Sequence, residues 1–112
     1  MKLAIIGGRD FNDYEKLVSS LADIEGVKLV ISGGAKGADA LAERYAKEKD
    51  IEFIKFLPDW NIHGKAAGPI RNELIIKTCD RVVAFWDGKS PGTRSSIELA
   101  KKYRKRYRIV GY

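Results

Sequence analysis

The chain has 112 residues, of which 45% are hydrophobic, with 21 Lys and Arg against 15 Asp and Glu. This length is typical of one domain, residues 1–112, and it argues against a large multi-domain enzyme. The formal charge of +6 equals the charge of the segment KKYRKRYR at 101–108, so the rest of the chain is neutral and the excess is local.

The sequence also argues against disulfide-bonded, zinc-binding, exported and membrane-spanning proteins. Cys79 is the only cysteine and His63 the only histidine, so neither an intramolecular disulfide nor a common Cys/His zinc site can form. The N-terminal apolar run is too short for a signal peptide, and no run of about 18 apolar residues follows. We therefore expect a cytoplasmic protein without a membrane span, a metal or a required cofactor.

The first half of the chain predicts two strands and two helices. Each strand is a short apolar run that ends at a pair of glycines, and each helix has apolar residues at helical spacing. In chain order the elements are a strand at 3–6, a helix capped by Asn12 or Asp13 with apolar positions up to Ile24, a strand at 27–31 and a helix at 38–46.

The second half continues the alternation. A helix is expected to begin at Gly68-Pro69, because proline is tolerated in a first turn, and to face inward with Ile70, Leu74 and Ile75. The elements are a strand at 51–57, that helix, a strand at 81–86, a helix from Thr93 or Ser95 to Tyr103 and a strand at 107–110.

This order predicts an α/β fold with a mostly parallel five-stranded sheet, helices on both faces and right-handed crossovers. Ligands of such folds bind beyond the carboxyl ends of the strands, near the point where the strand order reverses. The segments that follow the first four strands contain nearly all the unusual residues, which favours a site at that edge. They are Gly7-Gly8-Arg9-Asp10, Ser32–Gly37, Pro58–Trp60 and Asp87–Thr93.

Two glycine-bearing segments favour phosphate binding. The first joins a strand to a helix, and its residues with candidate ligand roles are Ser32, Gly33, Gly34, Lys36, Gly37 and Asp39. The second is Ser90–Ser96, where Gly92 and Thr93 are the candidates. Glycines let main-chain amides approach an anion at a helix N-terminus. Neither segment is a Walker or GxGxxG motif, and the alternatives are a tight packing turn and ordinary capping by Thr93, Ser95 or Ser96.

Arg71 is expected in the first turn of its helix, where a cation opposes the helix dipole. This placement indicates either an anionic ligand or an ion pair with Glu73 or Asp59. Asn72 beside Arg71 is a candidate for contact with a ribose or a base edge.

Further candidates follow the first and third strands. Arg9 is a candidate anion ligand, and Asp10 either accepts from a ribose hydroxyl or caps the first helix. Trp60 either stacks on a base or covers the core. His63 is either a general base or simply exposed.

Several motifs resemble a known family. SGGAKGADALAERYA is similar to the SGGARGxD segment of the Smf/DprA and LOG superfamily. GGRDFNDYE, PDWNIHGKAAGPIRN and AFWDGKSPGTRSSIELA resemble the YspA-related branch of this SLOG group. The resemblance implies a Rossmann-like three-layer α/β/α domain that holds a nucleotide or a nucleotide-derived ligand, often as a homodimer. Some members bind DNA, some sense signalling nucleotides, and LOG enzymes cleave nucleoside monophosphates.

For LOG-type cleavage the resemblance implies an Arg on the third helix and a PGGxGTxxE segment. Arg71 matches the first, whereas Ser96 stands where the family has Glu. Glu98 lies about 200° around the helix from position 96. The candidate catalytic residues of such an N-glycosidase are therefore Arg71 with Asp87 or Glu98.

The leading hypothesis is binding of a nucleotide or nucleotide-derived ligand, as a sensor or otherwise, with phosphate at Gly33-Gly34, Gly92-Thr93 and Arg71. One alternative is a LOG-like phosphoribohydrolase. The other is DprA-like DNA binding through KKYRKRYR. The competing interpretation of this segment is a solvent-exposed helix end and edge strand, whose lysines and arginines prevent aggregation between sheets.

Overall fold

A computed structural model describes all residues, 1–112, and contains one five-stranded sheet in the order β3-β2-β1-β4-β5. All neighbouring strands pair in parallel, so the sheet is fully rather than mostly parallel. The strands are β1 (Lys2–Gly7), β2 (Leu29–Ser32), β3 (Glu52–Lys55), β4 (Arg81–Trp86) and β5 (Arg106–Gly111).

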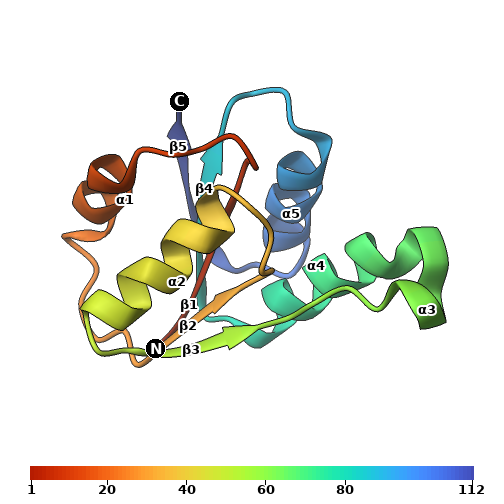
Figure 1. The fold of residues 1–112 in the computed structure, drawn as a ribbon, viewed down its shortest axis with the longest axis horizontal. Coiled ribbons are helices and arrows are strands. Elements are labelled where there is room, and N and C mark those ends of the chain that lie inside the picture. The colour runs from red at the N-terminus through yellow and green to blue at the C-terminus, as the bar shows by residue number, and fades with distance from the viewer.

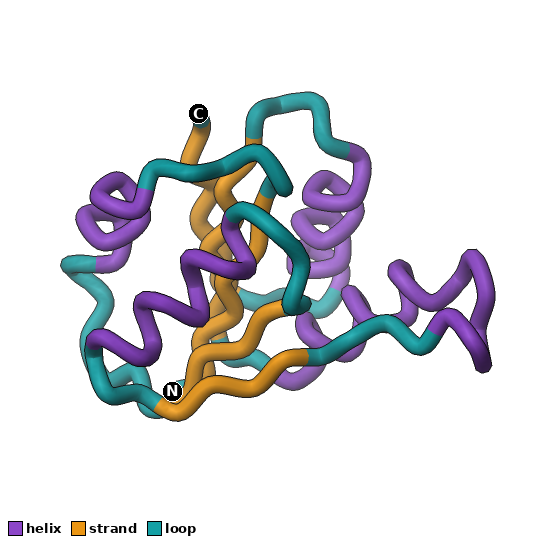
Figure 2. The backbone as a smooth tube through the Cα atoms, in the orientation of Figure 1, coloured by secondary structure: helices purple, strands orange, loops and turns teal.

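Helices cover both faces of this sheet, as expected for a Rossmann-like three-layer fold. They are α1 (Tyr14–Leu21), α2 (Ala38–Glu48), α3 (Trp60–His63), the 3-10 helix η1 (Gly64–Ala66), α4 (Ala67–Thr78) and α5 (Pro91–Lys102). Helices α1 and α2 lie on one face, and α4 and α5 lie on the other (Figure 1). Figure 2 shows that α3 and the start of α4 extend sideways from the rest of the molecule.

Each face of the sheet has its own apolar core because successive strand residues point to opposite sides. Leu3 and Ile5 of β1 join the core under α1 and α2, together with Phe11 and Phe85. Ala4 and Ile6 join the core under α4 and α5, which also contains the buried thiol of Cys79. The near-continuous apolar runs of β1 and β4 are thus those of central strands buried on both faces.

Several predicted boundaries are wrong. The first helix ends at Leu21, so Ile24 is buried in the following segment, and β3 ends at Lys55 rather than at residue 57. Helix α5 begins at Pro91, so Thr93, Ser95 and Ser96 lie inside the helix and do not cap it.

The third predicted helix also needs correction. Residues 60–66 form α3 and η1, which the sequence did not indicate, and α4 begins at Ala67. Arg71 therefore lies in the second turn of α4, so the argument from the helix dipole at the first turn does not apply. Ile75 and Ile76 face the core, whereas Leu74 is 50% exposed.

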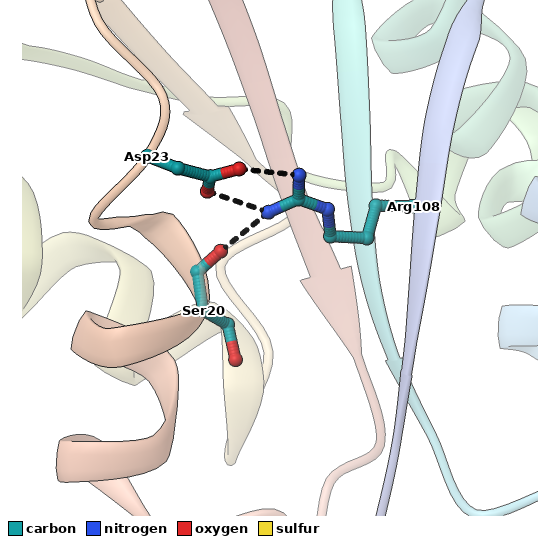
Figure 3. Close-up of polar contacts among 3 residues, drawn as sticks. All are labelled: Ser20, Asp23 and Arg108. Atoms are coloured by element: carbon teal, nitrogen blue, oxygen red, sulfur yellow. Dashed lines mark hydrogen bonds and ion pairs between the residues drawn. The ribbon is translucent and has the colours of Figure 1, made fainter.

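The basic segment at 101–108 is part of the fold. It forms the last turn of α5, a turn at Arg104 and the first half of β5. Arg108 donates to both carboxylate oxygens of Asp23, at 2.8 and 2.7 Å, and to the Ser20 carbonyl (Figure 3). Lys105 donates to the Cys79 carbonyl at 2.7 Å. Two of the six cations therefore hold β5 and the turn before it to the segments that follow α1 and α4.

Among the helices described, none combines the length and the apolar character needed to cross a membrane.

Candidate functional site

A cavity of about 400 Å³ lies where the strand order reverses. In the sheet, β2 lies on one side of β1 and β4 lies on the other side. The chain that leaves β1 continues toward β2, whereas the chain that leaves β4 continues toward β5, so the segments that follow β1 and β4 diverge. The cavity is lined by residues from the β1–α1 and β2–α2 connections, from α4 and from the start of α5. Its volume is within the range of small-molecule sites.

The two connections on the α2 side are held against each other. The main-chain amide of Ala38 donates to the Gly8 carbonyl at 3.1 Å. Gly37 has a φ of +74°, and a Cβ atom there would overlap the same carbonyl. Only glycine meets both conditions without strain, which explains the third glycine of SGGAKG.

Arg71 reaches into the cavity from α4. Its Nη1 donates to the Gly33 carbonyl at 2.7 Å, and its Nε donates to the Asn72 side-chain oxygen at 2.8 Å. Arg71 forms no ion pair with Asp59 or Glu73: Glu73 pairs with Lys77, and Asp59 caps α3 by accepting from the Ile62 amide. Burial lowers the pKa of Arg71, but a guanidinium stays charged near neutral pH. The Nη2 group donates to no atom of the protein, so it is free to bind an anion in the cavity.

Asp39 is the buried acid of the cavity, with 8% of its surface exposed. Its carboxylate accepts from the Ala35 amide at 3.0 Å. Burial raises the pKa of Asp39, while the hydrogen bond from Ala35 and the charge of Arg71 act in the opposite direction. Asp39 therefore fixes the β2–α2 connection and partly balances the charge of Arg71.

Two helix N-termini reach the cavity without side-chain caps. Helices α1 and α3 are capped by Asp13 and Asp59, whereas α2 and α5 have no side-chain cap. The first amides of a helix lack partners within the helix. At α5 these include the amides of Gly92 and Thr93, next to buried hydroxyls of Thr93 and Ser96. The arrangement favours an anion with several acceptor oxygens.

The structure brings many of the predicted site residues together. Those that line the cavity are Gly7, Gly8, Arg9, Asp10, Gly33, Asp39, Arg71, Asn72, Gly92 and Thr93. Those outside its lining are Ser32, Gly34, Lys36, Gly37, Trp60, Asp87 and Glu98. Ser32 instead donates to the Ile5 carbonyl at 2.6 Å, and Trp60 is 56% exposed on α3.

The two acids proposed for cleavage have other contacts. Asp87 accepts from the amides of Lys89 and Ser90, both at 2.8 Å, and these hydrogen bonds lower its pKa. Glu98 pairs with Lys101 and borders a second, smaller cavity. The carboxylates that line the cavity together with Arg71 are those of Asp10 and Asp39.

Other residues of the site were not identified as candidates from the sequence. Ile6, Ala35, Ile75, Ser90, Pro91 and Ser96 also line the cavity. Ser90, Pro91 and Ser96 fall within the segment chosen for its hydroxyls and glycine, whereas Ile6 and Ile75 carry no signal other than apolarity. Tyr112, at the end of β5, hydrogen bonds to Asp10, and no local pattern connects residues so far apart in the chain.

Comparisons with known proteins agree with this architecture. The profile of the YspA, cpYpsA-related SLOG family matches residues 1–63. The Gene 61 protein of Mycobacterium phage D29 is 36% identical in a match that covers 90% of this chain and 89% of that protein.

A solved structure is also similar over nearly the whole chain. It is DNA processing protein A from Helicobacter pylori, described for its single-stranded DNA binding mode. The TM-score is 0.74 at 28% identity, and the match covers 97% of this chain. This chain spans 64% of the length of that structure.

Proposed function

Because the chain belongs to the YspA, cpYpsA-related SLOG family, we propose that its cavity binds the phosphate-bearing part of a nucleotide or nucleotide-derived ligand. The observation that carries this proposal is the position of Arg71. Its guanidinium is held by the Gly33 carbonyl and Asn72, and its free Nη2 shares a cavity with the amides of the α5 N-terminus.

These groups favour phosphate over a simple apolar ligand. A phosphate presents several acceptor oxygens, so it can take hydrogen bonds from Arg71 and from the amides of Gly92 and Thr93 at once. A hydrogen bond to a charged group contributes about 1.5–3 kcal/mol. The hydroxyls of Thr93, in the first turn of α5, and of Ser96, in its second turn, add donors that line the same cavity.

The test is isothermal titration calorimetry with nucleoside monophosphates, ADP-ribose and cyclic nucleotides. Arg71→Met should weaken the binding of the best ligand by about tenfold or more, because it removes a charged hydrogen bond. Arg94→Met is the matched control, since Arg94 lies over the ring of Trp86 and outside this cavity. No binding at millimolar concentrations, or an equal loss in both variants, would contradict the proposal.

A second candidate function is binding of single-stranded DNA, for which the likeness to DNA processing protein A is the supporting observation. A nucleotide within a strand offers the same phosphate chemistry to the cavity. The basic segment at 101–108 lies elsewhere, because α5 ends and β5 begins at the amino edge of the parallel sheet. DNA binding at the cavity should therefore depend on Arg71 and not on Lys101 or Lys102, as a single-stranded oligonucleotide in the same titration would reveal.

We further propose that a second copy of the chain covers the exposed apolar surface on β3, α3 and α4. This surface consists of Ile54, Leu57, Trp60, Ile62, Ile70 and Leu74, which are 38–74% exposed. Helix α4 is apolar on two sides, with Ile75 and Ile76 on the core and Ile70 and Leu74 outward, as in helices covered on both sides.

The charges around this surface favour a second copy over a nucleic acid. The acids Glu52, Asp59 and Glu73 are balanced by Lys55, Lys65 and Lys77. A balanced mixture has no net attraction for a polyanion, whereas a two-fold interface can place an acid that is not paired within the chain, such as Glu52, near a base of the other copy.

Sedimentation analysis tests this interface with two matched substitutions. Ile54 and Ile109 are both 43% exposed and lie on the two opposite edge strands. We expect a dimer for the wild type and for Ile109→Glu, and a monomer for Ile54→Glu. A monomeric wild-type protein at high concentration, or dissociation by Ile109→Glu alone, would contradict the assignment.

A further inference from the structure

The Asp10 side chain neither caps a helix nor forms an ion pair, which are the usual structural roles of an aspartate in such a connection. It lines the cavity, yet Asp13 is the residue that caps α1, by accepting from the Lys16 amide at 3.0 Å. Asp10 also forms no ion pair with a Lys or Arg side chain, although Arg9 is its neighbour in the chain. Its position therefore calls for another explanation.

Tyr112 fixes the position of Asp10. The Tyr112 hydroxyl donates to Asp10 Oδ1 at 2.5 Å across 102 residues of sequence. The ring of Tyr112 packs against Phe11 with centroids 4.8 Å apart, and Phe11 stacks on Phe85. The amide of Tyr112 donates to the Trp86 carbonyl at 3.3 Å. Burial and the Asp10 carboxylate raise the pKa of Tyr112, so its hydroxyl stays a donor at neutral pH.

The second glycine of GGRD makes room for this contact. A Cβ atom at Gly8 would overlap the Tyr112 hydroxyl. Gly8 also lines the cavity beside Asp10. The glycine therefore leaves room for the Tyr112–Asp10 pair at the edge of the cavity.

The chemistry of the pair indicates which part of a ligand it contacts. A carboxylate repels phosphate, whereas it accepts hydrogen bonds from hydroxyl groups. Tyr112 occupies Oδ1, and Oδ2 of Asp10 accepts from no group of the protein, so Oδ2 is available to a sugar hydroxyl. Arg71 and the α5 amides lie in the same cavity for the phosphate.

Building on the proposed phosphate site, we propose that Asp10 recognises the ribose hydroxyls of the ligand and that Tyr112 is its positioning residue. The ligand class is then a ribonucleotide or a ribonucleotide derivative with a free vicinal diol. A deoxyribonucleotide loses one of the donors, and a dideoxyribonucleotide loses both.

The experiment compares the affinities of a ribonucleotide, its deoxy form and its dideoxy form by calorimetry. The wild type should bind the ribonucleotide about tenfold or more tightly than the dideoxy form, as expected for hydrogen bonds to a charged acceptor. Asp10→Asn and Tyr112→Phe should each reduce this ratio. Tyr112→Phe keeps the ring on Phe11, so thermal melting should show a folded protein. Asp13→Asn is the matched control in the same connection, since asparagine caps equally well.

Each outcome separates this inference from the proposed function. Equal affinities for the three sugars in the wild type would overturn sugar recognition by Asp10 while leaving the phosphate site in place. A ratio that falls in Asp10→Asn but not in Tyr112→Phe would overturn the role of Tyr112. The absence of binding for all three ligands would overturn both the inference and the proposed phosphate site.

Discussion

Arg71 illustrates how far a single residue could be predicted. Its position after GPI in a helical segment predicted a cation that binds an anionic ligand or forms an ion pair. In the structure Arg71 lines the cavity. The predicted helix turn was wrong, because η1 leads directly into α4 and places Arg71 one turn later. Its partner Gly33 was not predictable, since a contact between residues 38 positions apart depends on the tertiary fold.

The ion pair of Asp23 and Arg108 predicts a pH dependence of stability. The hydrogen bonds from Arg108 lower the pKa of Asp23 from 3.8 to about 2. Because the pKa is lower in the folded state, the pair stabilises the protein above the unfolded value and loses this contribution as the pH falls from 3.8 to about 2. In Asp23→Asn the melting temperature should therefore fall less steeply over this range.

The control for this measurement is Glu25→Gln, because Glu25 lies in the same connection and forms no ion pair. Its melting temperature should follow the wild-type pH dependence. A carboxyl titration by NMR should also give a midpoint near 2 for Asp23 in the folded protein. An ordinary midpoint, or equal pH profiles for the wild type and Asp23→Asn, would mean that the pair is not formed in solution.

The strands and longer helices were predictable as elements because their apolar patterns reflect burial. β1 and β4 are buried on both faces, which produces continuous apolar runs. Helix α3 was not predictable because it is one turn long and has no buried residue. The start of helix α5 was predicted at Thr93 or Ser95, too far along the chain, because Pro91 and Gly92 are typical of a loop but here belong to its first turn.

Substitution of Gly37 tests the contact between the β1–α1 and β2–α2 connections, which border the cavity. Gly37 and Gly26 both have a φ of +74°, but only a Cβ at Gly37 would meet other atoms. Gly26→Ala should destabilise the protein by about 1–2 kcal/mol, the cost of a left-handed conformation. Gly37→Ala should cost about 1–3 kcal/mol more, because the Gly8 carbonyl must also move.

Denaturant unfolding of the two variants measures this difference. The comparison removes the conformational term, which both variants share, and leaves the overlap with the β1–α1 connection. Ligand binding should weaken in Gly37→Ala and stay unchanged in Gly26→Ala, because Gly26 lies at the opposite, amino edge of the sheet, where its carbonyl accepts from the N-terminal amine of Met1. Equal stabilities would show that the two connections are not held together as described.

The topology of the whole molecule determines where its chemistry can occur. The order β3-β2-β1-β4-β5 makes the segments after β1 and β4 diverge, and the cavity occupies that position. The sequence predicted the edge because the glycine-bearing segments follow strands, but it did not order the strands. The net charge of +6 did not indicate the position of the cavity, because the basic segment at 101–108 lies at the amino edge of the sheet. Two of its cations, Lys105 and Arg108, also form hydrogen bonds within the fold.

The central claim is that a nucleotide phosphate binds between Arg71 and the N-terminus of α5. Mapping of amide chemical shifts by NMR during titration with a nucleoside monophosphate tests it most directly. The largest changes should occur at the amides of Gly8, Gly33, Gly92 and Thr93. The absence of changes there, or changes confined to residues 101–108, would contradict the claim.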